Sequence, residues 1–92
     1  MADIRGKSYK AIAYDVAEGY VTVNPIFLKP LEPKVIKELY EELVKILAQI
    51  RGEKIKHGDV EAIRWRNMRL QRLHSASMII KTFVRERRLK IF

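Results

Sequence analysis

Arginine side chains that could bind phosphate or carboxylate groups concentrate in the last third of this 92-residue sequence. Between residues 59 and 92, nine basic residues face three acidic ones, and the formal net charge of the whole chain is +8. The nine are Arg64, Arg66, Arg69, Arg72, Lys81, Arg85, Arg87, Arg88 and Lys90. Most are arginines, whose planar guanidinium binds two oxygens at once. Most of the net charge therefore lies in a segment suited to a polyanion or an acidic protein surface.

This distribution predicts a positive stripe that follows a sugar-phosphate backbone. Binding of that kind is driven by counterion release and is insensitive to base sequence. Tyr9 and Tyr20 could add stacking on unpaired bases. The sequence has no zinc-finger spacing, no glycine-rich phosphate loop and no aromatic RNA-binding motif, so we do not expect base-specific readout. The alternative interpretation is a solvated face rich in Arg and Lys, as in thermophilic proteins.

The sequence pattern offers little for catalysis or metal binding. Neither His57 nor His74 has a spacing that would hold a metal ion or activate a serine. The lack of cysteine excludes disulfides, thiolate nucleophiles and sulfur-held metals, and it favours an intracellular protein. No apolar stretch approaches the roughly 20 residues needed to cross a bilayer. We expect a non-enzymatic, cytoplasmic protein, nucleoid-associated if it binds DNA, with no cofactor, metal, membrane or small-molecule substrate.

The beginning of the chain is predicted to form a β-hairpin. Its first strand, residues 8–16, would direct Tyr14 into the core, and its second, residues 20–24, is rich in β-branched side chains. The loop between them would hold Gly19 in the left-handed conformation. The proline-rich residues 25–33 are predicted to follow as an extended strap across the core.

Apolar residues at three- and four-residue spacing predict a helix from Pro33 to Arg51. Glu32 lies at or near its N-cap and Gly52 ends it. A glycine-containing loop follows, and Asp59 is a suitable N-cap for a second helix from Val60 to about Leu89. The expected fold is therefore α+β: one domain, residues 1–92, with the hairpin packed on an antiparallel helix pair.

The second predicted helix is longer than the first, at roughly 45 Å against roughly 30 Å for 1.5 Å per residue. Either it breaks near residues 74–77, or its basic end projects beyond the hairpin to meet a partner. Arg69 and Arg72 fall within its apolar arc, near Trp65, which we expect to be a core anchor. For Arg69 the alternatives are an internal pair with a glutamate of the first helix, a solvated guanidinium, or a phosphate contact.

Residues 39–91 resemble the helical domain of the GINS subunits, which assemble at the replication fork and bridge the helicase to other replication proteins. The resemblance lies in an amphipathic helix containing residues 36–40, a loop, and a long Arg- and Leu-rich helix. This last helix ends in the sequence Arg87-Arg88-Leu89-Lys90-Ile91. The resemblance implies a scaffold whose exposed arginines meet acidic partner surfaces as readily as DNA.

Two functions are open at this point. The first is a small basic nucleic-acid-binding protein of the replication, repair or chromatin type, with DNA favoured over RNA. The second is a protein interaction subunit, such as a GINS-like scaffold or a polymerase or helicase accessory, whose arginines bind acidic surfaces. A homo-oligomer or a subunit of a larger complex is an open alternative, because so short a chain buries a limited core, and the second function predicts that the isolated chain self-associates.

Overall fold

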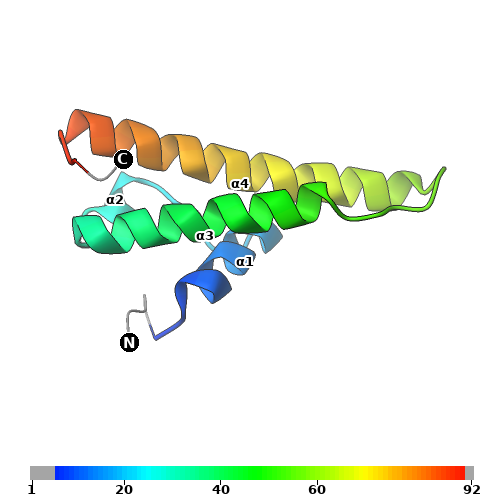
Figure 1. The fold of residues 1–92 in the computed structure, drawn as a ribbon, viewed down its shortest axis with the longest axis horizontal. Helices are drawn as coiled ribbons and strands as arrows, with labels where there is room; N and C mark the ends of the chain where they lie inside the picture. The colour runs from blue at the N-terminus through cyan, green and yellow to red at the C-terminus, as the bar shows by residue number, and fades with distance from the viewer. Residues whose placement is uncertain (1–5, 91–92) are drawn as a thin grey trace.

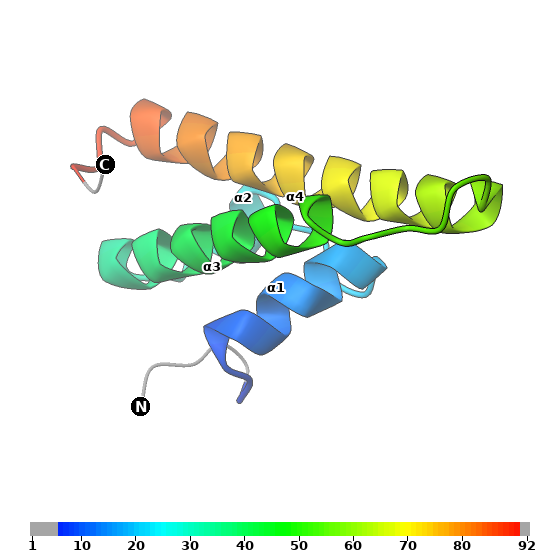
Figure 2. The same ribbon diagram turned by 45° about the vertical axis from the view of Figure 1, so that its right-hand side comes forward.

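The computed structural model describes residues 6–90, which form four helices and no β-strand. Helix α1 spans Tyr9–Glu18, α2 spans Pro25–Leu28, α3 spans Pro33–Arg51 and α4 spans Val60–Glu86. Helices α3 and α4 run antiparallel, and α1 packs across both of them (Figure 1). The short α2 lies against α4 (Figure 2). The chain is therefore all-α over the described residues, and the α+β prediction is wrong.

Helix α1 replaces the first predicted strand because its buried side chains follow a helical period. These side chains are Ile12, Ala13, Val16 and Ala17. Tyr14, which the strand pattern placed in the core, is 41% exposed, and its hydroxyl donates to Gln49 Oε1 at 3.3 Å. Gly19 is left-handed as predicted, with φ of 86°, but it caps the C-terminus of α1 instead of forming a hairpin loop. Residues 21–24 pair with no strand within the described chain.

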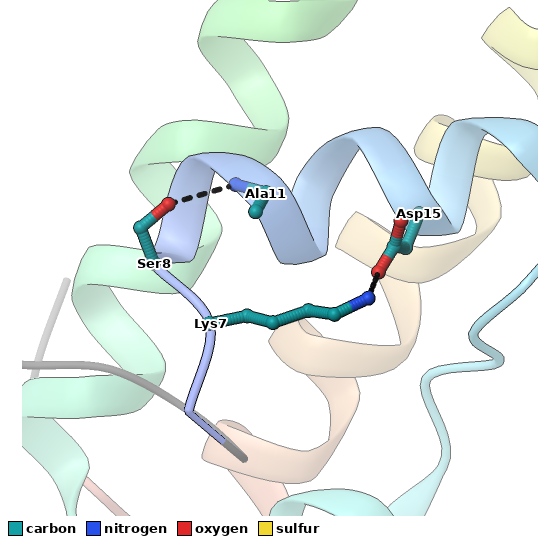
Figure 3. A network of polar contacts seen from close by, with 4 residues as sticks. All are labelled: Lys7, Ser8, Ala11 and Asp15. Atoms are coloured by element: carbon teal, nitrogen blue, oxygen red, sulfur yellow. Dashed lines mark hydrogen bonds and ion pairs between the residues drawn. The ribbon is translucent and has the colours of Figure 1, made fainter.

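Local polar contacts hold the first turns of α1 (Figure 3). Ser8 Oγ accepts a hydrogen bond from the Ala11 N–H at 3.1 Å, which satisfies one of the free donors at the helix start. Lys7 Nζ lies 2.7 Å from Asp15 Oδ2, so the residue before the N-cap is tied to the second half of the helix. These two contacts, with Gly19 at the other end, define a short helix that strand propensity alone does not reveal.

The predicted extended strap is also wrong in part, because its first residues form α2. Asn24 Oδ1 accepts a hydrogen bond from the Phe27 N–H at 2.8 Å, and Pro25 occupies the first helical position. Phe27 and Leu28 are buried, whereas Ile26 is 85% exposed.

Helix α3 confirms its prediction at both ends, with Glu32 as N-cap, Pro33 as first residue and Gly52 as C-cap. Its inner face packs against α1 and α4. The largest fully buried side chains of the core are Ile12, Leu28, Ile36, Leu39, Leu43, Ile46, Leu73 and Ile80. They come from all four helices, so the core lies where these helices meet.

Helix α4 is unbroken over 27 residues, and no break occurs at residues 74–77. Its predicted N-cap is confirmed, because Asp59 Oδ1 accepts a hydrogen bond from the Ala62 N–H at 3.0 Å. Ser77 Oγ is satisfied within the helix by the His74 carbonyl at 2.7 Å. The overhang lies at the opposite end from the one expected: the first turns of α4 project beyond α1 and α3 (Figure 1). Within the described chain, no helix is long and apolar enough to span a membrane.

Candidate nucleic-acid interface

The nine predicted basic residues do not form one stripe, because the helix turns them to different sides. Successive residues of an α-helix differ by about 100° in direction. Arg64 and Arg85 therefore point to the outer side of α4, whereas Arg69 and Arg72 point toward the packed side with the buried Leu73 and Ala76. Contacts with other side chains divide the nine further.

Arg72 joins α4 to the end of α1. Its Nη1 donates to the Ala17 carbonyl at 3.0 Å, and a cation at a helix C-terminus is favoured by the helix dipole. The guanidinium also lies against Gly19, where a Cβ would be 3.0 Å from Arg72 Cζ. Its Cζ is 5.7 Å from the centre of the Trp65 ring. Arg72 is thus a structural residue in this fold.

Arg69 is paired internally, but with a different partner from the one expected. Its Nη2 lies 3.0 Å from Glu53 Oε1, in the loop between α3 and α4 and not on α3. Its Cζ is 5.8 Å from the centre of the Trp65 ring. Trp65 is 41% exposed with a guanidinium from each of two arginines near its ring, so its predicted role as a core anchor is wrong.

Two more of the nine lie over aromatic rings. Lys81 Nζ is 5.8 Å from the centre of the Tyr40 ring, and Arg87 Cζ is 4.9 Å from the centre of the Phe83 ring. Such cation–π contacts orient a side chain and contribute about 0.5–1 kcal/mol at exposed sites. Both residues remain exposed, so an anion could still reach them.

The remaining five have no ion pair or hydrogen bond with any described side chain. They are Arg64, Arg66, Arg85, Arg88 and Lys90. Arg66 is half-buried, and its Nε is buried without a hydrogen-bond partner within residues 6–90. The other four are exposed. These are the cations of α4 and its C-terminal extension that are available to an external anion.

These five lie at the two ends of α4. At one end, the loop after α3 runs beside the first turns of α4 (Figures 1 and 2) and adds two exposed lysines. We call Lys54, Lys56, Arg64 and Arg66 the loop-end group. The C-terminal group consists of Arg85, Arg88 and Lys90. Residue 91, the last of the GINS-like sequence, lies outside the described residues.

The outer face of α4 between these groups carries the uncharged polar side chains of Asn67, Gln71, Ser75 and Thr82. Met78, 47% exposed, lies on the same face, and exposed Lys81 lies at its edge, about 40° around the helix from Arg85. A shallow groove of about 430 Å³ runs along one side of this part of α4, and Val16, Gly19 and residues 21–23 form its other wall. Tyr20 does not line the groove, but it is 81% exposed and could stack on a base. Tyr9 is half-buried against the core, so the predicted stacking role suits Tyr20 better.

Arg88 adopts a backbone conformation that favours glycine. Its φ is 55°, and its N–H donates to the Arg85 carbonyl at 3.1 Å. The Leu89 N–H donates to the Val84 carbonyl at 2.9 Å, and half-buried Leu89 packs on the core. This is a Schellman motif, whose left-handed position is usually occupied by glycine. An arginine there costs stability, and backbone strain of this kind is often found at functional positions.

No metal centre is evident in the described part of the chain, where no three His, Asp or Glu side chains are grouped to hold an ion. His57 and His74 are both exposed and lie on different elements. Comparisons with protein-family models, curated proteins and solved structures found no match to this chain.

Proposed function

We propose that this protein binds the phosphate backbone of nucleic acid, as a small non-enzymatic protein of the replication, repair or chromatin type. The observation that carries the proposal is the set of unpaired cations at the two ends of α4, the loop-end and C-terminal groups. Like charges left unpaired near one another repel and destabilise a compact fold. A polyanion would neutralise them and release its own counterions, which drives binding.

The strained conformation of Arg88 supports the same proposal. Glycine would satisfy the Schellman motif with less strain, so folding does not account for an arginine there. A contact between the guanidinium and a phosphate would account for it.

The proposal is tested with charge-matched variants. Arg64→Ala/Arg85→Ala removes one cation from each end of α4, whereas Lys10→Ala/Lys45→Ala removes two exposed cations from α1 and α3. We expect the arginine variant to bind a labelled duplex of about 20 base pairs roughly tenfold more weakly than wild type at about 50 mM salt. The lysine variant should bind within about twofold of wild type, since nonspecific long-range charge contributes little beyond a Debye length. No binding by wild type, or equal losses in both variants, would contradict the proposal.

A second candidate function, a protein interaction subunit, is favoured by exposed apolar side chains. Tyr20, Ile26 and Met78 are exposed on the connector and on α4. Exposed apolar side chains suit a partner with apolar surface, and the exposed arginines suit acidic side chains on that partner. The GINS-like scaffold belongs to this candidate.

Mass in solution separates the two candidates. Sedimentation of the chain alone and with duplex DNA should show a monomer that gains mass with DNA if backbone binding is the function. A self-associated chain whose mass is unchanged by DNA, and whose association is lost in Tyr20→Ser/Ile26→Ser, would support the interaction subunit instead.

A further inference from the structure

The loop-end and C-terminal groups are held apart by one rigid element. Arg64 and Arg85 belong to the same unbroken helix, so helix geometry fixes their separation. At 1.5 Å per residue their Cα atoms are about 32 Å apart along the axis. This is close to one turn of B-form DNA, about 34–36 Å.

The two arginines also point in similar directions. At about 100° per residue, their directions around α4 differ by only about 60°. Both are exposed. The outer face between them carries the uncharged side chains of Asn67, Gln71 and Thr82. Exposed Lys81 lies one turn before Arg85, over the Tyr40 ring, and residues 65–80 carry no exposed Lys, Arg, Asp or Glu. The exposed charge of α4 is therefore concentrated towards its two ends.

We infer that α4 lies lengthwise along a double helix, with its two cation groups on phosphates about one helical turn apart. The inference rests on the proposed backbone binding and adds the kind of nucleic acid and the mode of contact. Arg64 and Arg85 are too far apart to contact phosphates on the two sides of one groove, since the major and minor grooves are about 12 and 6 Å wide. On one face of a duplex, the backbone of the same strand returns after one turn.

The shape of the molecule is compatible with this mode. Its extents are 45 × 26 × 20 Å, and α4 follows the longest of them (Figure 1). The first turns of α4 project beyond α1 and α3, which leaves Arg64 accessible. A duplex lying along the outer side of α4 would therefore meet Arg64 and Arg85 without obstruction by the other helices, whereas half-buried Arg66 points to the opposite side of α4.

A length series of DNA hairpins tests the inference. A stem of about 8 base pairs is roughly 27 Å long and can reach one group, whereas a stem of about 14 is roughly 48 Å long and can reach both. For each stem, the association constant is divided by the number of positions at which the protein can bind, which gives the affinity per register. We expect this affinity to rise about tenfold from the shorter to the longer stem, because the longer stem adds about two phosphate contacts at low salt. In Arg85→Ala/Arg88→Ala the rise should disappear.

Two further variants show whether the loss comes from the missing cations or from disruption of the C-terminal end of α4. Lys54→Ala/Arg64→Ala, at the other end of α4, should abolish the same rise, whereas Lys10→Ala/Lys45→Ala should retain it. Equal affinity per register for both stems in wild type would overturn the two-ended contact and leave backbone binding intact. Tighter binding of a single strand than of the longer stem would also overturn it. Failure to bind any of these DNAs would overturn the proposed function itself.

Discussion

Arg72 and Arg64 show how one residue type serves different purposes on the same helix. Arg72 donates to the Ala17 carbonyl and lies over Trp65, whereas Arg64 is exposed without a partner among the described residues. The arginine content and the presence of Arg69 and Arg72 in the apolar arc could be predicted from the sequence. Their partners, the Ala17 carbonyl and Glu53, come from elements whose position depends on the whole fold, so they could not.

This difference predicts unequal effects on stability. Arg72→Ala should lower the free energy of unfolding by about 1–3 kcal/mol, because it removes a charged hydrogen bond at the end of α1 and apolar packing against Trp65. Arg64→Ala should change it by less than about 0.5 kcal/mol. Urea unfolding followed by circular dichroism measures both, and equal effects would contradict the structural assignment of Arg72.

A second residue-scale prediction concerns Arg88. Arg88→Gly should raise the free energy of unfolding by up to about 1 kcal/mol, because glycine adopts the left-handed conformation without steric cost. Arg88→Ala removes the same charge but retains the Cβ, so it should give no such gain. If the two variants melt at the same temperature, backbone strain at this position is negligible.

At the scale of elements, α3 and α4, which have clear capping residues, were predicted correctly. Pro33, Gly52 and Asp59 mark the limits of α3 and the start of α4, and the structure confirms them. The first segment also has such signals, Ser8 and Gly19, but its alternating Ile12, Tyr14 and Val16 equally match a strand. Packing against α3 and α4 buries Ala13 and Ala17 and leaves Tyr14 exposed. This packing, which the sequence does not show, distinguishes the helix from the strand.

The junction between α1 and α4 gives a prediction with a matched control. Gly19→Ala should destabilise the protein more than Gly58→Ala, although both glycines have φ of 86°. A Cβ at Gly19 would meet the Arg72 guanidinium at 3.0 Å, whereas nothing lies within 4 Å of one at Gly58. We expect about 1 kcal/mol from the backbone at each position and a further loss at Gly19 as Arg72 is displaced. Equal melting temperatures would show that the Arg72 contact contributes nothing.

At the scale of the whole molecule, the charge is divided between two ends of one long helix. The sequence predicted the excess of charge and the helix that carries it. It did not predict the division, because Arg69, Arg72, Lys81 and Arg87 are engaged by partners that lie far from them in the sequence or on another turn. The remaining cations stand about one DNA turn apart.

The central claim, that these cations bind a phosphate backbone, is tested most directly by the salt dependence of duplex binding. Each phosphate contact contributes about −0.9 to the slope of log K against log salt concentration. With two to five of the unpaired α4 cations in contact, a duplex of about 20 base pairs should give a slope of about −2 to −4.5 between 50 and 200 mM salt. A slope near zero, or no binding at about 50 mM salt, would contradict the account.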